Sequence, residues 1–107
     1  MSIEILGATD PVVDEFCERL KEYASLRPDA KIELYRHNPY SIRVRVIDDQ
    51  FRGKTKVMRH REVWPILEKL PEDTLSELSF LVLIPPEERD SVMSSREFDG
   101  KPIASAF

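Results

Sequence analysis

The 107-residue sequence predicts one α+β domain, built from a three-stranded mixed sheet with helices on one face. Three observations support this fold class. Apolar residues recur at helical spacing over residues 10–26, and they alternate with a period of two over residues 31–47. A nearly continuous apolar run at residues 78–84 follows a second helical pattern. The predicted order is therefore helix, strand, strand, helix, short helix, strand and short helix.

The first helix is predicted to begin after Asp10 and to end near Leu26. Asp10 is a favourable N-cap, and Pro11 suits the first helical position. Cys17 lies on the apolar stripe, so we interpret it as a small buried residue rather than a reactive thiol. Residues 1–8 are interpreted as a short edge strand or a loose arm. The stripe consists of Val13, Phe16, Cys17, Leu20 and Ala24.

An antiparallel hairpin is predicted over residues 31–47, with one apolar face packed on the first helix. Its alternation leaves Tyr35, Arg43 and Arg45 on the opposite face. His37 lies at the expected hairpin tip, where an exposed titratable side chain is favoured over a metal ligand.

The second long helix is predicted from Gly53 to Leu70. Its spacing places one set of residues on the inner face, with arginines on the outer face. The inner set is Val57, His60, Trp64 and Leu67, flanked by Val63 and Leu70. Pro65 predicts a kink or a restart, because a proline inside a helix removes one backbone hydrogen bond. The residues predicted to be buried are Val44, Val46, Val57, Trp64, Phe80 and Val82.

The apolar run at 78–84 is predicted to be a strand covered on both faces. A short final helix is predicted over residues 85–93, so that the domain comprises residues 1–93. Residues 94–107 are expected to form a tail that is either mobile or packed on the domain. Phe98, Ile103 and Phe107 are the tail residues able to cover the bare face of the sheet.

Basic residues are concentrated in the middle of an acidic chain. Residues 43–61 contain seven Lys or Arg and two Asp, whereas the whole chain has a net charge of −4. Gly53 permits a left-handed backbone before the helix, which would leave the amides of Lys54, Thr55 and Lys56 unpaired and pointing outward. Such a helix start is a plausible anion site, while a merely solvated charged face is the alternative interpretation.

Other classes of protein are disfavoured by what the sequence lacks. Cys17 is the only cysteine, so neither an internal disulfide nor a cysteine metal cluster is expected. No secretory signal or membrane-spanning run is predicted, and we expect a cytoplasmic protein. No P-loop, nucleophile elbow or HExxH motif is present, which argues against an enzyme.

The residues around Gly53 resemble the signature of the BolA family. In that family F-x-G-K and R-H-R-x-V follow a hairpin, as they do here over residues 51–63. The segments at 78–80 and 86–88 resemble the family's last strand and the turn after it, so the resemblance covers about residues 31–88. It implies a KH-like fold of the second type, in the predicted order of elements.

BolA-like proteins are non-enzymatic regulators, and the resemblance implies two kinds of partner. Some members bind DNA through the loop and helix that correspond to residues 53–61. Many pair with a monothiol glutaredoxin around a two-iron, two-sulfur cluster. Ser76 stands where the family places a histidine ligand, and His37 corresponds loosely to the second ligand. Because a serine hydroxyl is a poor ligand for cluster iron, no shared cluster is predicted.

The sequence therefore predicts a regulatory module that binds DNA or RNA weakly through residues 53–61. The alternative is a protein-partner adaptor of the glutaredoxin type. No metal or cofactor is predicted, and His37 is a weak metal candidate. The predicted nucleic-acid or anion-binding residues are Arg43, Arg45, Gly53, Lys54, Lys56, Arg59, His60 and Arg61.

Overall fold

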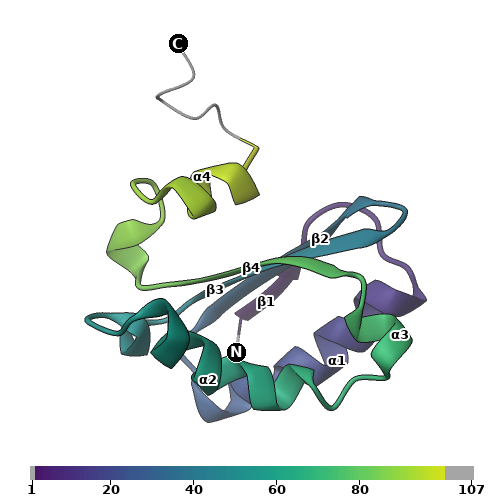
Figure 1. The fold of residues 1–107 in the computed structure, drawn as a ribbon, viewed down its shortest axis with the longest axis horizontal. Helices are drawn as coiled ribbons and strands as arrows, with labels where there is room; N and C mark the ends of the chain where they lie inside the picture. The colour runs from purple at the N-terminus through teal and green to yellow at the C-terminus, as the bar shows by residue number, and fades with distance from the viewer. Residues whose placement is uncertain (1, 101–107) are drawn as a thin grey trace.

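A computed structural model describes residues 2–100 and shows an α+β domain with a four-stranded mixed sheet (Figure 1). The spatial order of the strands is β1-β2-β3-β4. The strands are β1 (Ser2–Ile5), β2 (Lys31–Asn38), β3 (Ser41–Ile47) and β4 (Leu78–Ile84). The α-helices are α1 (Pro11–Leu26), α2 (Lys56–Leu67), α3 (Glu72–Leu75) and α4 (Met93–Phe98), and the 3-10 turns are η1 (Asp49–Phe51) and η2 (Pro86–Glu88).

The sheet has one strand more than the three predicted. β1 pairs in parallel with β2, so the edge-strand interpretation of residues 1–8 is confirmed for residues 2–5. β2 and β3 form the predicted antiparallel hairpin, and β3 pairs in parallel with β4. With four residues, β1 is too short for alternation alone to identify.

The main core lies between the sheet and the two long helices. Asp10 caps α1 as predicted, because its carboxylate accepts hydrogen bonds from the amides of Val12 and Val13. The apolar stripe of α1 then packs on the inner faces of β2 and β3. Val44, Val46 and Val82 are buried as predicted, while Trp64 and Phe80 are partly buried. Cys17 is also only partly buried.

Helix α2 departs from the sequence prediction in its start, its inner face and its continuity. It begins at Lys56, because Thr55 caps it by accepting a hydrogen bond from the Met58 amide. The helix also continues through Pro65 and ends two residues later, so the lost backbone bond falls in its last turn. A restart of the helix at Pro65 is therefore wrong.

The inner face of α2 agrees with the prediction at Leu67 and differs from it at Val57 and His60. Val63, Ile66 and Leu67 reach the core, and Arg59, one turn before Val63, faces the same way. Val57 consequently points outward and is 61% exposed, so its predicted burial is wrong.

The second face of the sheet is covered by α4, which lies beyond the predicted last helix (Figure 1). Residues 86–88 form only a 3-10 turn, and the helix itself begins at Met93. Phe98 packs with Ile47, Val82 and Ile84, which confirms the prediction that this residue covers the bare face. Ile103 and Phe107 lie outside the described residues.

Candidate functional site

The loop-helix segment (residues 53–61) joins η1 to the first turns of α2. Gly53 has φ +76°, which is the left-handed conformation expected of it. The predicted set of free amides is shifted along the chain, because the Lys54 amide donates to the Phe51 carbonyl oxygen at 3.2 Å. The unpaired amides of the first helical turn are therefore those of Lys56 and Val57, and the Met58 amide donates to Thr55 Oγ1 at 3.2 Å.

Two basic residues of this segment are exposed and unpaired. Lys56 and Arg61 form no ion pair with any residue in the described part of the chain. His60 is exposed beside them and stacks on Trp64, with ring centroids 4.9 Å apart and planes at 22°. The prediction that His60 lies on the inner face is therefore wrong, and its ring is available at the surface. These side chains form a small cationic surface at the start of α2.

Lys54 is only partly available. Its ammonium lies 3.6 Å from Glu62 and 3.4 Å from the Gln50 side-chain oxygen. Its side chain is 27% exposed. Such a long, half-exposed pair is weak, so Lys54 can turn toward an anionic ligand at small cost.

Arg59 has a structural role, although its sequence position predicted an outward-facing phosphate contact. Its guanidinium donates to the carbonyl oxygens of Lys54 and Leu83, each at 2.9 Å. It also pairs with Glu88, at 3.1 Å. Only 13% of the side chain is exposed. The outward placement of Arg59 is therefore wrong, because this side chain joins α2 to β4 and η2.

The two arginines of β3 lie beneath α4 rather than on an open rim. Arg45 is fully buried, donates to Glu33 Oε1 at 3.0 and 2.8 Å, and pairs with Asp99 at 2.9 Å. Its guanidinium also lies over the Phe98 ring, 4.5 Å from the centroid. The expectation that Arg45 is accessible is wrong, because α4 covers it.

Arg43 is partly buried on the same face of the sheet. Its Nη1 donates to the Tyr35 hydroxyl and to the Glu97 carbonyl oxygen, each at 3.3 Å. It also lies over the Phe80 ring. Arg43 and Arg45 are therefore separated from the loop-helix segment by β4, and neither extends its cationic surface.

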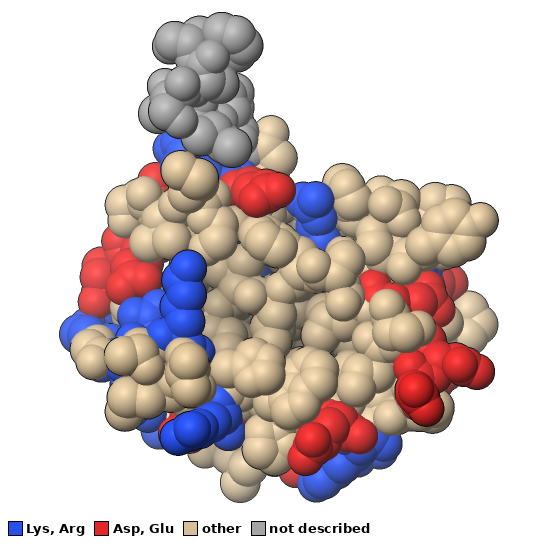
Figure 2. Space-filling model, viewed as in Figure 1, with Lys and Arg blue, Asp and Glu red and all other residues tan. Residues whose placement is uncertain are grey.

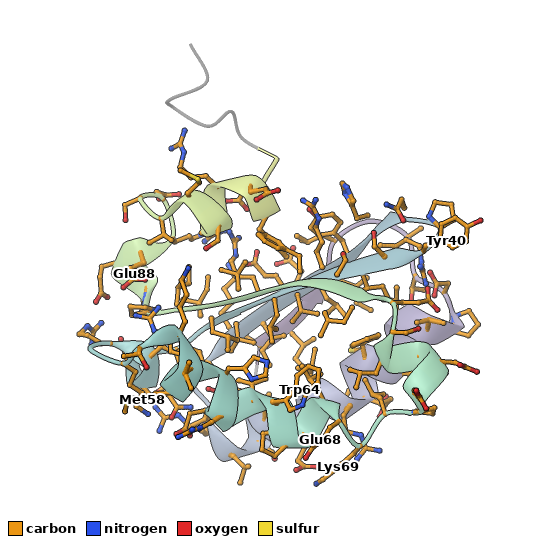
Figure 3. All side chains as sticks on the ribbon, viewed as in Figure 1. Tyr40, Met58, Trp64, Glu68, Lys69 and Glu88 are labelled. Atoms are coloured by element: carbon orange, nitrogen blue, oxygen red, sulfur yellow. The ribbon has the colours of Figure 1, made fainter. Side chains whose placement is uncertain are left out.

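A groove follows the outer edge of β4, between α2 and the chain that leads into α4. Its volume is about 310 Å³. In Figure 2 the centre of the molecule is hollowed and uncharged, and basic side chains border it on the side where α2 begins. Glu88 and Met58 stand on opposite sides of the end of β4 (Figure 3). The lining residues include Lys56, His60, Phe80, Leu81, Leu83, Val92 and Ser94.

The positions related to cluster binding lie elsewhere. His37 is exposed near the hairpin tip, at the opposite end of the sheet from the loop-helix segment (Figure 1). The Ser76 hydroxyl donates to the Asp73 carbonyl oxygen at 2.7 Å, and Ser76 is the C-cap residue of α3. Among residues 2–100, no group of three or more His, Cys, Asp and Glu side chains is arranged to hold a metal ion.

No family model and no curated protein matches the chain. No helix within residues 2–100 is long and apolar enough to cross a membrane.

The groove was not predicted from the sequence, because it depends on how α2 and α4 flank β4. No local sequence pattern indicates that arrangement. The Glu33–Arg45 pair could have been found, since the two residues are opposite each other in the predicted hairpin.

Proposed function

We propose that this chain is a non-enzymatic, BolA-like regulatory module that binds nucleic acid weakly through the loop-helix segment. The observation that carries the proposal is the exposure of Lys56 and Arg61 without an ion-pair partner among the described residues. Arg45, Arg52 and Arg59 are neutralised by Asp or Glu, as Arg52 is by Glu87 at 2.6 Å, whereas Arg43 donates to uncharged oxygens. Charges left unpaired on an acidic domain are available for phosphate oxygens.

The geometry supports contact with a phosphate at the start of α2. The Lys56 ammonium and the free amides of Lys56 and Val57 belong to one helical turn, where the helix dipole favours an anion. Lys54 lies just before this turn, and Arg61 lies in the next turn. About three phosphate contacts are therefore expected from this surface. Binding through so few contacts is weak and salt-sensitive.

The protein-partner adaptor is the second candidate. It is favoured by the ion pairs that remove Arg45, Arg52 and Arg59 from the accessible positive charge. In this alternative the partner is of the glutaredoxin type. Cluster sharing remains disfavoured, because Ser76 offers only a hydroxyl that already donates to the main chain.

Titration of fluorescently labelled duplex and single-stranded DNA oligonucleotides, at low and at moderate salt, tests the proposal. The double variant Lys56→Ala/Arg61→Ala should lose most of the binding at low salt. The control Lys21→Ala/Lys69→Ala removes the same charge from two lysines that are ion-paired with Glu18 and Glu22 of α1, and it should retain binding. Absence of binding at low salt, or equal binding by both double variants, would support the adaptor instead.

A further inference from the structure

β4 is an edge strand whose outer side has no partner strand among the described residues. It pairs with β3 on one side only, at the end of the sheet order. An edge strand presents a row of unpaired amide and carbonyl groups, and proteins usually cover or disrupt such a row. Here the row lies at the bottom of the β4-edge groove, so it is recessed yet open to a ligand.

The hydrogen bonds at the end of β4 show which of its residues face outward. The Ile84 carbonyl oxygen accepts from the Asp48 amide, next to β3, whereas the Leu83 carbonyl oxygen accepts from Arg59 on the outer side. Because the direction of the backbone groups alternates along a strand, the amide and carbonyl groups of Leu81 also face outward. Arg59 thus already fills one position that a neighbouring strand would fill.

The walls of the groove differ in chemistry. The α2 wall presents Lys56 and His60, whereas the other wall presents Val92 and Ser94. The lining also includes Glu88, whose carboxylate is already paired with Arg59. The floor is apolar, and both Phe80 and Leu81 are only partly buried. A ligand in this groove would therefore meet positive charge on one side and apolar surface on the other.

We propose that the β4-edge groove binds an extended, acidic peptide segment of a partner protein as a fifth strand of the sheet. The peptide backbone would pair with the outward groups of Leu81 and the amide of Leu83. Its side chains would alternate, with carboxylates toward Lys56 and His60 and aliphatic groups toward Phe80 and Val92. The groove shares Lys56 and His60 with the proposed nucleic-acid surface, but peptide binding at the strand edge does not depend on nucleic-acid binding.

A single peptide fits this recess better than a second copy of the domain. α2 flanks one side of the β4 edge, and residues Val92 and Ser94 flank the other, so the edge lies between walls (Figures 1 and 2). A whole sheet approaching edge to edge would meet these walls, whereas one extended segment passes between them. The basic α2 wall in turn selects an acidic segment.

The test uses a labelled hexapeptide of alternating valine and glutamate, with blocked ends, added to the full chain. Binding is followed by fluorescence anisotropy, and amide protection is followed by NMR hydrogen exchange. We expect saturable binding and slower exchange of the Leu81 and Leu83 amides. An analogue with N-methyl groups on the alternate residues that pair should bind at least about tenfold more weakly, because it lacks the donors. A valine-lysine peptide of the same length should also bind more weakly.

Two protein variants localise the contact to the strand edge. Leu81→Pro removes the outward amide hydrogen but no hydrogen bond to β3. Leu81→Ala is its control, because it also removes the leucine side chain but keeps the amide. We expect Leu81→Pro to bind the peptide at least about threefold more weakly than Leu81→Ala. Equal binding of the peptide and its N-methyl analogue would overturn the proposal. A single-stranded oligonucleotide that protects the Leu81 amide, where the peptide does not, would overturn it as well.

Discussion

The guanidinium of Arg59 donates to the main-chain carbonyl oxygen of Leu83 at 2.9 Å, so a helix side chain takes the position of a strand donor. The same guanidinium pairs with Glu88 and with the Lys54 carbonyl oxygen. Three segments of the chain therefore meet at one side chain. Arg59 therefore has a structural role, whereas Arg61, in the same basic run of α2, is exposed.

Substitution of Arg59 should reduce stability without changing nucleic-acid affinity. Arg59→Ala removes charge-assisted hydrogen bonds that are mostly buried, and we expect the free energy of unfolding to fall by about 2 kcal/mol. Arg61→Ala should change it by less than about 0.5 kcal/mol, because that side chain is exposed. Urea denaturation of both variants provides the measurement. Equal stability of the two variants would contradict the structural role of Arg59.

The buried pair of Arg45 and Glu33 is expected to be a larger determinant of stability. Arg45→Ala would leave the Glu33 carboxylate buried without its main partner, at a cost of about 3–5 kcal/mol. The double variant Glu33→Gln/Arg45→Gln removes both charges of this pair, so its destabilisation should be smaller than the sum of the two single changes. Thermal and urea unfolding of Glu33→Gln, Arg45→Gln and the double variant measure this coupling. Strict additivity would be inconsistent with a direct pair.

Acid should weaken the contact between α1 and the hairpin. Hydrogen bonds from Arg36, the shortest at 2.6 Å, lower the pKa of Asp10 from its usual 3.8 to about 2. Because the folded-state pKa is the lower one, this stabilisation is present above about pH 4 and is lost as the pH falls toward 2. Asp10→Asn keeps an N-cap acceptor but loses the charge, at about 1 kcal/mol near neutral pH.

The pH dependence of this difference is the measurement that checks the Asp10 prediction. Urea midpoints of the native protein and of Asp10→Asn should differ at pH 7 and converge near pH 2. Asp10→Ala should stay less stable than Asp10→Asn at both values, because it also loses the N-cap acceptor. A constant gap between the native protein and Asp10→Asn from pH 7 to pH 2 would show that the charge is not involved.

Gly53 should tolerate some side chains better than others. With φ +76° and open space around the position of a Cβ atom, Gly53→Ala introduces backbone strain but no collision. We expect a loss of about 1 kcal/mol for Gly53→Ala and a smaller loss for Gly53→Asn, since asparagine adopts the left-handed conformation more readily. Chemical denaturation compares the two. A larger loss for Gly53→Asn would contradict this explanation.

Local sequence patterns predicted the elements of this fold more fully than they predicted its surfaces. The cap at Asp10, the alternation through the hairpin and the apolar run of β4 each act over a few residues, so they can be read directly. The fourth strand was left undecided because β1 is short. The cover of the second face was predicted through Phe98, Ile103 and Phe107 but not as a helix, because α4 depends on contacts with distant strands.

The candidate site was predicted in part for a related reason. The basic run identified Lys56 and Arg61, but charge alone does not show which residues have partners. Arg59 faces inward because Val63, one turn later, defines the buried side of α2. Arg45 is neutralised by a residue that lies 12 positions earlier in the chain. Which basic side chains are accessible is therefore known only from the three-dimensional structure.

The salt dependence of nucleic-acid binding tests the central claim most directly. With about three phosphate contacts, from Lys54, Lys56 and Arg61, the log–log slope of affinity against salt on duplex DNA should be about −2.7. Lys56→Ala and Arg61→Ala should each flatten it by about one unit, whereas Arg59→Ala should leave it unchanged when the protein stays folded. A slope near zero, or a slope that Arg59→Ala flattens while Lys56→Ala does not, would contradict the account.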